Sequence, residues 1–406
     1  MMKSIREIFR IGYGPSSSHT MGPRKAAEIF VARFPHAASY EVHLYGSLSA
    51  TGRGHLTDVA IMDVIPSLEI VWHDEFLPFH PNGMRFCAWD ERGELLNEWI
   101  VYSVGGGALE EDSNNSKFLI QNLELPDIYP LSRLSDIKED CDKMGWDYWE
   151  YVEHCEGQAI WDYLREVWQV MRESVERGLD HEGVLPGPLH LRRKAASYYI
   201  KVAAYKDNLR TRGLVFSYAL AVSEENASGG KIVTAPTCGS CGVLPAVLYH
   251  SWRSRDFSET RILHALATAG LIGNVVKANA SISGAEVGCQ GEVGVACAMA
   301  SGAVNQLFGG TLAQIEYAAE MGLEHHLGMT CDPVCGLVQI PCIERNAFAA
   351  ARALDSNMYA AFSDGTHSVS FDRVVDVMKQ TGHDLPSLYK ETSQGGLAKE
   401  YKNNKR

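Results

Sequence analysis

The sequence has no long hydrophobic run and no excess of positive charge. Its most apolar stretches, around 263–276 and 293–304, are interrupted by polar residues or shorter than the ~20 residues of a membrane-spanning helix. The first residues, MMKSIREIFRIGYG, lack the apolar centre of a signal peptide. Asp and Glu (50) outnumber Lys and Arg (37), so the formal net charge is −13. We therefore expect a cytoplasmic protein that binds neither membranes nor nucleic acid.

The ten cysteines lack the closely spaced C-x-x-C-x-x-C run of a ferredoxin. Five of them nevertheless fall between residues 281 and 346, among Gly, Ala and Pro. Cysteines without a secretory signal serve metals or chemistry more often than disulfides. Cys289, Cys331 and Cys342 each lie near Gly or Pro, whose turns free backbone N–H groups to bond sulfur. Three thiolates would leave one metal position open for a substrate.

Spacing alone does not decide that these three thiols share a metal, because free cysteine is also a frequent core residue. Cys297, in the apolar run VGVACAMA, fits that alternative. Cys238 and Cys241 form a C-x-x-C in a glycine turn, which suits redox exchange or zinc but lacks a second C-x-x-C. His325 and His326 could add ligands, although adjacent side chains point in different directions.

A serine-rich turn near the N-terminus leads into a predicted helix that begins near Pro23 and continues to Phe34. Backbone N–H groups and hydroxyls at such a helix start can bind an anion, here a carboxylate. The structural alternative is an ordinary N-cap with extra serines. The candidate residues of this turn are Ser16, Ser17, Ser18, His19 and Thr20.

Two polar turns follow among predicted strands. The glycine-rich turn GSLSATGRGHLTD carries His55 and Thr57, and the turn FHPNGM carries His80 and Asn82. A lone histidine is more often a satisfied structural residue than a catalyst, so the pattern only nominates these side chains. The neighbouring segments alternate or are rich in β-branched and aromatic residues, as strands are. These segments are YEVHLY, EIVW, MRFCAWD and EWIVYSVGGG, whose triple glycine permits a close approach of ligand or backbone.

The sequence predicts two regions of different fold class. Residues 1–138 read as an α+β domain with an antiparallel component, and residues 139–406 as a mainly α-helical domain. The polar, proline-containing stretch from Glu110 to about Met144 is predicted to be a linker. A long amphipathic helix is predicted from Trp146 to Gly178. Beyond it, Ala, Gly, Leu and Val at helical spacing predict closely packed helices.

Several long motifs follow one another along the chain. They are GPSSSHTMGPRKAAE, YGSLSATGRGHLTD, FHPNGM, YSVGGG, TAPT, ISGAEVGCQGEVGVAC, TCDPVCGLVQIPCIERN and KETSQGGLA. Together they resemble the iron–sulfur-dependent L-serine dehydratases (L-serine ammonia-lyases) in their single-chain form. The resemblance covers almost the whole chain in order and implies an N-terminal β-type domain before an α-helical cluster-binding domain. It implies a [4Fe–4S] cluster on Cys289, Cys331 and Cys342.

The resemblance also implies a reaction, the conversion of L-serine to pyruvate and ammonia in amino-acid degradation and gluconeogenesis. A cluster iron would act as Lewis acid on the substrate hydroxyl. His55 and Thr57 match the GH-x-TD motif, and His80 and Asn82 match the HPN motif, both implicated in substrate handling. We expect His55 to be the base, His80 and Asn82 to orient the substrate, and the Ser16–Thr20 turn to hold its carboxylate. The site would then lie between the domains, in a chain expected to form a homodimer.

Two departures from the family pattern leave the resting cluster open to interpretation. Single-chain members often end in a cysteine that caps the fourth iron, whereas the printed sequence has none after Cys342. Cys238, Cys241 and Cys335 stand where other residues are expected. We therefore expect an open or water-bound fourth iron, with one of those three thiols as the alternative ligand.

Three other functions compete with serine dehydration. The same chemistry could act on L-threonine or L-cysteine, since one methyl group changes selectivity by only ~1–3 kcal/mol. A non-catalytic amino-acid or redox sensor on this scaffold would lack a cluster cysteine or His55, and neither is lost. A pyridoxal phosphate enzyme would need a lysine-bearing motif that the sequence does not show.

Overall fold

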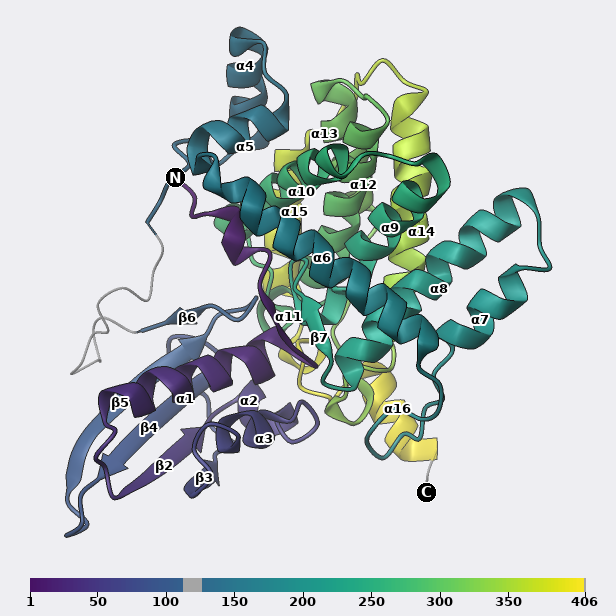
Figure 1. Cartoon of the computed structure of the whole chain (residues 1–406). Helices are drawn as coiled ribbons and strands as arrows, with labels where there is room; N and C mark the ends of the chain where they lie inside the picture. The colour runs from purple at the N-terminus through teal and green to yellow at the C-terminus, as the bar shows by residue number, and fades with distance from the viewer. Residues whose placement is uncertain (112–125, 405–406) are drawn as a thin grey trace.

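The structure, a computed structural model, describes residues 1–111 and 126–404. Strands and short helices of the first 110 residues form one α/β part, and helices from residue 134 onward form a larger part beside it (Figure 1). This order confirms the predicted α+β region followed by a mainly α-helical one. The division at residue 138 stays a prediction.

The α/β part is built on a mixed five-stranded sheet in the order β3-β2-β4-β5-β6. The pair β2–β3 is parallel, while β2–β4, β4–β5 and β5–β6 are antiparallel, as the predicted antiparallel component requires. All four segments predicted as strands are found. The strands are β2 (Ser39–Leu44), β3 (Leu68–Trp72), β4 (Gly83–Trp89), β5 (Leu95–Ser103) and β6 (Leu109–Glu110).

Three helices cover one face of this sheet (Figure 1). The apolar residues on alternate positions of the strands face them and form a separate core. Phe30 of the first helix stacks on Trp99 of β5 with ring centroids 6.2 Å apart and packs against Phe86 of β4. The helices are α1 (Gly22–Arg33), α2 (Ser47–Thr51) and α3 (Thr57–Met62).

The helical part surrounds two almost fully buried helices, α10 and α12. Their interfaces are lined by small residues, as the sequence predicts. A Cβ at Gly322 would lie 2.9 Å from the backbone of Ala298, so only glycine allows this approach of α13 to α12. The helices are α4 (Leu134–Met144), α5 (Tyr148–Glu156), α6 (Ala159–Asp180), α7 (Ala195–Val202), α8 (Asp207–Ala227), α9 (Val243–Arg255), α10 (Glu259–Asn279), α11 (Gly284–Val287), α12 (Val295–Leu307), α13 (Leu312–Glu324), α14 (Cys342–Ala361), α15 (Phe371–Asp384) and α16 (Gly396–Asn404).

The N-terminal segment joins the two parts. Met2, Ile5, Ile8 and Phe9 are buried in the core of the helical part, not in the core under the sheet. Strand β1 (Ile11–Tyr13) then pairs antiparallel with β7 (Lys231–Val233), which follows α8. The serine-rich turn therefore starts against the helical part before the chain enters α1.

Two local predictions were wrong. The predicted linker is in part ordered, because Glu110 belongs to β6 and Leu134–Met144 form α4, which buries Leu134, Ile137 and Cys141 on one face; residues 112–125 lie outside the described residues. The single helix predicted over 146–178 is broken at Gly157, whose φ of 74° ends α5, and α6 continues to Asp180.

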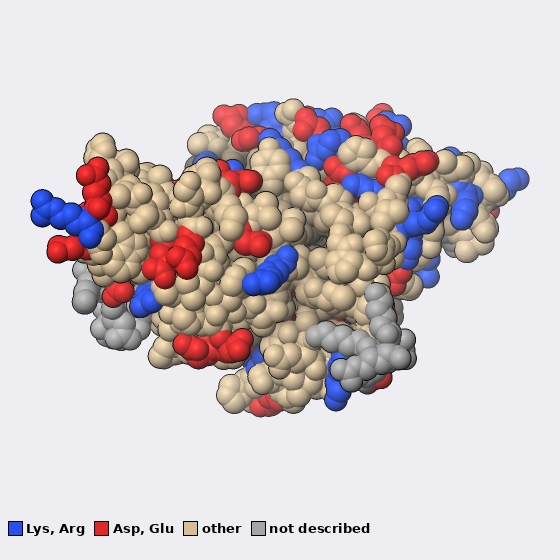
Figure 2. All heavy atoms as spheres, turned by 90° about the horizontal axis from the view of Figure 1, so that it is seen from below, with Lys and Arg blue, Asp and Glu red and all other residues tan. Residues whose placement is uncertain are grey.

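The surface shows how the negative net charge is distributed. On the face in Figure 2, acidic and basic side chains are interspersed among uncharged residues. Across residues 1–111 and 126–404, no helix combines the length and the apolarity that a bilayer crossing requires.

Candidate active site

The helical part supplies three buried cysteines at points where regular structure begins. Cys289 precedes a π-helical turn that leads into α12, and Cys342 is the first residue of α14. Cys331 lies in an extended segment that bridges Lys390. Gly288 allows the segments of Cys289 and Cys331 to meet, because a Cβ there would lie 2.7 Å from the carbonyl oxygen of Met329. Local glycine and chain reversal thus bring segments distant in sequence together.

A buried carboxyl group lies among these thiols. Glu292 Oε2 is 3.8 Å from the sulfur of Cys289 and 3.9 Å from that of Cys331. Its other oxygen accepts a hydrogen bond of 2.8 Å from the hydroxyl of Thr237. Burial raises the pKa of Glu292, since a charge in this place is poorly solvated. The Cys289, Glu292 and Cys331 donor atoms lie close enough together to hold a metal ion.

The chemistry of the donor set fits an iron–sulfur group. Hydrogen bonding to Cys289 and burial raise the pKa of Cys331, and burial and Cys289 raise that of Cys342. Such thiols keep their protons unless a cation replaces them. Arg345 supplies nearby positive charge, and its side chain donates to the carbonyl of Thr330 over 2.7 Å. Thiolates held in this way are the ligands that iron–sulfur groups use.

The serine-rich turn of the α/β part is buried and internally bonded. Ser16 Oγ accepts the backbone N–H of His19 at 3.0 Å, as an N-cap does, and the hydroxyl of Thr20 donates to the carbonyl of His55 at 2.7 Å. The first amides of the turn Ser17–Met21 follow this cap. Amides at this position have no acceptor within their own helical turn, so they can serve an anion.

Hydrogen bonds define which nitrogen of His55 carries the proton. The hydroxyl of Thr51 donates to the carbonyl of Ser47 at 3.0 Å, so its oxygen must accept from His55 Nδ1 at 3.1 Å. Nε2 is therefore a bare lone pair, and it has no hydrogen-bond partner among the described residues. Burial lowers the pKa of His55 to about 4, so the imidazole is neutral at pH 7. A neutral buried lone pair of this kind can accept a proton.

The second histidine has the opposite character. The backbone N–H of Asn82 donates to His80 Nδ1 at 3.1 Å, which leaves the proton on Nε2. Within the described part of the chain, the Nε2–H of His80 and the side-chain oxygen Oδ1 of Asn82 have no hydrogen-bond partner. Burial lowers the pKa of His80, against the effect of Glu286 3.6 Å away. His55 thus offers an acceptor, and His80 a donor.

Ser283 of the helical part adjoins this region. Its hydroxyl is buried and has no hydrogen-bond partner among residues 1–111 and 126–404. A Cβ on Gly105 would lie 3.2 Å from the Ser283 side chain, so the triple glycine does permit a close approach between the two parts.

Thr57 lies in different surroundings. Its hydroxyl donates to the carbonyl of His19, and the residue is fully buried. That bond ties the glycine-rich turn to the serine-rich turn.

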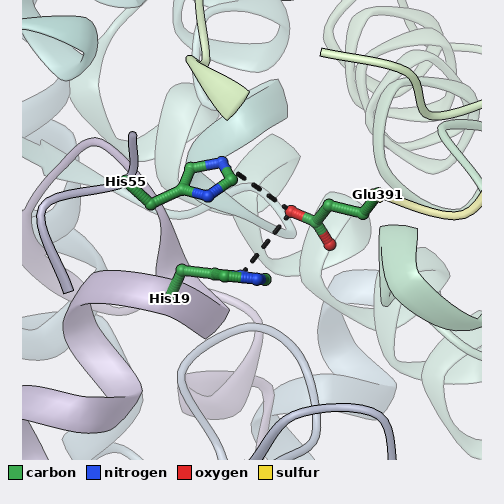
Figure 3. A group of neighbouring side chains, drawn as sticks. All are labelled: His19, His55 and Glu391. Atoms are coloured by element: carbon green, nitrogen blue, oxygen red, sulfur yellow. Dashed lines mark ion pairs between the residues drawn. The ribbon is translucent and has the colours of Figure 1, made fainter. Parts of the chain in front are cut away.

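Glu391 is a buried acidic residue of this region that motif spacing did not single out. Its carboxyl oxygen Oε1 lies 3.7 Å from His19 Nδ1 and 4.0 Å from His55 Nε2 (Figure 3). Burial, and then Glu292 and Cys289, raise its pKa well above that of an ordinary glutamate. The available signal was its place in the motif KETSQGGLA, which the family resemblance includes without assigning a role. Glu292 lies likewise within a quoted motif.

Among the remaining sequence candidates, Cys238 adjoins these groups, because its backbone N–H donates to Ser17 Oγ at 3.5 Å and the preceding Thr237 bonds Glu292. Cys238 and Cys241 are buried, and burial raises the pKa of each. Cys335 has a φ of 58° and lies against Gly54. In the part of the chain that the structure describes, neither these three nor Cys342 joins a group of three metal-ligating atoms, although Cys289 is near enough to Cys342 to raise its pKa. His326 Nδ1 donates to the carbonyl of Gly322 over 2.7 Å, at the end of the helix that precedes it.

Comparisons with known proteins show the family of this chain. The profile of the serine dehydratase alpha chain matches residues 96–398, and that of the serine dehydratase beta chain matches residues 4–66 and 62–114. The chain is 42% identical to the L-serine dehydratase TdcG of Escherichia coli, over 98% of this chain and 99% of that protein. It is 39% identical to the L-serine dehydratase of Haemophilus influenzae and 40% to that of Streptomyces coelicolor, each over 98% of this chain and 99% of that protein. The chain therefore belongs to the serine dehydratase family, whose members are lyases.

Proposed function

We propose that the protein is an L-serine ammonia-lyase that converts L-serine to pyruvate and ammonia. One observation carries the proposal: His55 and His80 present buried nitrogens of opposite hydrogen-bonding character, which have no hydrogen-bond partner among the described residues. An elimination needs an acceptor for the α-proton and assistance for the departing hydroxyl. Glu391 links this region to the thiols, because its carboxyl lies 4.0 Å from His55 Nε2 and its N–H donates to the carbonyl of Cys331.

Cys289, Cys331 and Cys342 would hold a [4Fe–4S] cluster. When bound, the cluster supplies Lewis-acid chemistry that makes the serine hydroxyl a better leaving group. Glu292 is bonded to Thr237 and lies against two of the thiols, so its backbone turn and carboxyl fix the surroundings of the sulfurs. The role of this chain is to keep the three thiols buried and prepositioned.

The α/β part would handle the substrate and its protons. His55 Nε2 takes the proton from the α-carbon, and the Cβ–O bond breaks, so one water leaves for each aminoacrylate formed. His80 Nε2–H and Asn82 Oδ1 orient the polar groups of the substrate, and Thr57 holds the turn that carries His55. Within the serine-rich turn, the amides of Ser17 and Ser18 would bind the carboxylate of the substrate, because those of Ser16, His19 and Thr20 already donate inside the turn. Aminoacrylate becomes its imine, and water hydrolyses this to pyruvate and ammonia.

The test is to reconstitute the protein anaerobically with iron and sulfide and to assay several amino acids. We expect a brown chromophore near ~400 nm and pyruvate from L-serine. Formation of 2-oxobutyrate from L-threonine at equal efficiency would assign a broader substrate class, because a methyl group changes selectivity by only ~1–3 kcal/mol. Full iron and sulfide content without pyruvate would contradict the proposal.

A further inference from the structure

Glu391 is held in an unusual backbone conformation at the boundary between the two parts. Its φ is 60°, in the left-handed region that non-glycine residues rarely adopt. Its N–H donates to the carbonyl of Cys331 at 2.8 Å, and its carbonyl accepts from the hydroxyl of Ser47 at 3.1 Å. Two hydrogen bonds, one to each part of the molecule, thus fix where the side chain begins. Strain that is held in place by its surroundings in this way is typical of functional sites.

The carboxyl group faces acceptors and lacks a donor. His19 Nε2 donates to Ser47 Oγ at 3.1 Å, because the Ser47 hydroxyl itself donates to the carbonyl of Glu391. His19 Nδ1 is therefore unprotonated and accepts from Ser18 Oγ at 2.9 Å. His55 Nε2 is also a lone pair. In the described residues the only ion-pair partners within 4.0 Å of Glu391 are these two imidazoles, and neither distance is a hydrogen bond.

Such an arrangement calls for a ligand that carries positive charge and several N–H donors. A buried carboxylate without a cation is unfavourable, and two neighbouring lone pairs do not relieve it. A bound metal ion would need the lone pair of His19, which the hydroxyl of Ser18 already occupies. An ammonium group needs only acceptors, and the Glu391 carboxylate offers them while His55 Nε2 stays available for the α-proton.

We propose that the Glu391 carboxylate binds the α-ammonium group of the amino-acid substrate; this proposal rests on the proposed function. In an amino acid, the ammonium nitrogen and the carbon that loses its proton are bonded to each other. The acceptor of the ammonium must therefore lie close to the base, and Glu391 Oε1 lies 4.0 Å from His55 Nε2 (Figure 3). With the substrate carboxylate at the serine-rich turn, Glu391 makes the site select amino acids over hydroxy acids.

The test measures binding of two unreactive ligands that differ only in the ammonium group. L-Alanine and propanoate both lack the leaving hydroxyl, so the holoenzyme binds them without turnover, and calorimetry gives their affinities. Glu391→Gln should weaken L-alanine binding by at least about 30-fold, the effect of removing one partner of a buried charge pair. Propanoate affinity should change by less than about twofold. Glu400→Gln, an exposed residue of the same terminal segment, is the matched control and should change neither.

Iron content and the visible spectrum are measured for each variant, because Glu391 is bonded to the backbone of Cys331. If Glu391→Gln holds less iron, Glu391→Asp is used instead. Its shorter side chain keeps the negative charge but withdraws it from the site, and the affinities for L-alanine and propanoate are compared again. Equal weakening of both ligands, or none, would overturn the proposal. The proposal would also be overturned if the desalted wild-type protein retained a divalent metal other than cluster iron and the Glu391→Gln variant lost that metal. A wild type that binds L-alanine through Glu391 but forms no pyruvate from L-serine would refute the proposed function instead.

Discussion

The two parts of the molecule hold their functional groups by different means. In the helical part, the cysteines lie at helix starts and turns that closely packed neighbours fix, as Gly288 does against Met329. In the α/β part, the histidines lie in loops, and Leu56 before α3 has a φ of 57°. Those loops are fixed chiefly by hydrogen bonds such as that from Thr20 to the carbonyl of His55. The comparison teaches that the proposed metal ligands belong to one core, while the histidines proposed to handle protons are assembled against it.

The first prediction tests the helical part and has the largest effect. Replacing Cys289, Cys331 or Cys342 singly with Ala should abolish the ~400 nm chromophore and activity together, because each thiolate is a proposed ligand. Iron analysis and pyruvate formation measure both. Cys297→Ala is the control: Cys297 is fully buried in the same core, its sulfur contacts the carbonyl of Ala349, and the variant should keep both properties. Normal iron content in any of the three variants would remove that residue from the ligand set.

The second prediction concerns the α/β part, where function should be lost without loss of iron. His55→Gln removes the proposed base and should lower kcat by ~10²–10⁴-fold at unchanged iron content. His36→Gln, an exposed histidine of the same part, should behave as wild type. A near-normal kcat in His55→Gln would show that another group takes the α-proton, and loss of iron would show that the two parts are not separable as described.

The third prediction distinguishes orientation from chemistry within the α/β part. Asn82→Ala leaves the backbone N–H that fixes His80 but removes the unpartnered side-chain oxygen. KM for L-serine should rise by roughly tenfold, while kcat falls less, since ground-state binding is lost. His80→Gln should show the same pattern. Steady-state kinetics at matched iron content measure both effects, and a fall in kcat with unchanged KM would place these residues in the chemical step.

The sequence was informative where chemistry is concentrated in short motifs. Cys289 and Cys331 could be nominated from glycine-flanked positions, and the structure places their sulfurs around Glu292. The roles of His55 and His80 could not be separated from the sequence, because the tautomers depend on Thr51 and on the amide of Asn82. Motif spacing could not identify Glu391 for the same reason, because its environment is created by contacts between distant parts of the chain. Pattern identifies residue types, whereas burial and hydrogen-bond direction depend on tertiary structure.

The break of the predicted long helix at Gly157 teaches a related lesson. The amphipathic pattern continues through residues 148–180, but a glycine with φ of 74° ends the first helix. Periodicity detects a buried stripe and does not detect a change of direction between two helices that share it. The same limit explains α4, whose apolar stripe is hidden by a strongly polar composition.

The smallest predicted effect concerns the stability of the folded protein, which a buried histidine of the helical part should make dependent on pH. Burial and then Arg255 lower the pKa of His250 to about 4 in the folded protein, against ~6.5 for an unfolded imidazole. Between these values the unfolded state binds more protons, so stability rises with pH and is lost as pH falls below ~6.5. From pH 7.5 to 5.5 this one histidine should cost roughly 1 kcal/mol. His250→Gln should therefore reduce the change in urea midpoint between these pH values, measured anaerobically on the holoprotein, while His36→Gln leaves it unchanged. If His250→Gln keeps the full change, the acid sensitivity comes from other histidines whose pKa burial lowers, His326 of the helical part or His19 and His55 of the α/β part.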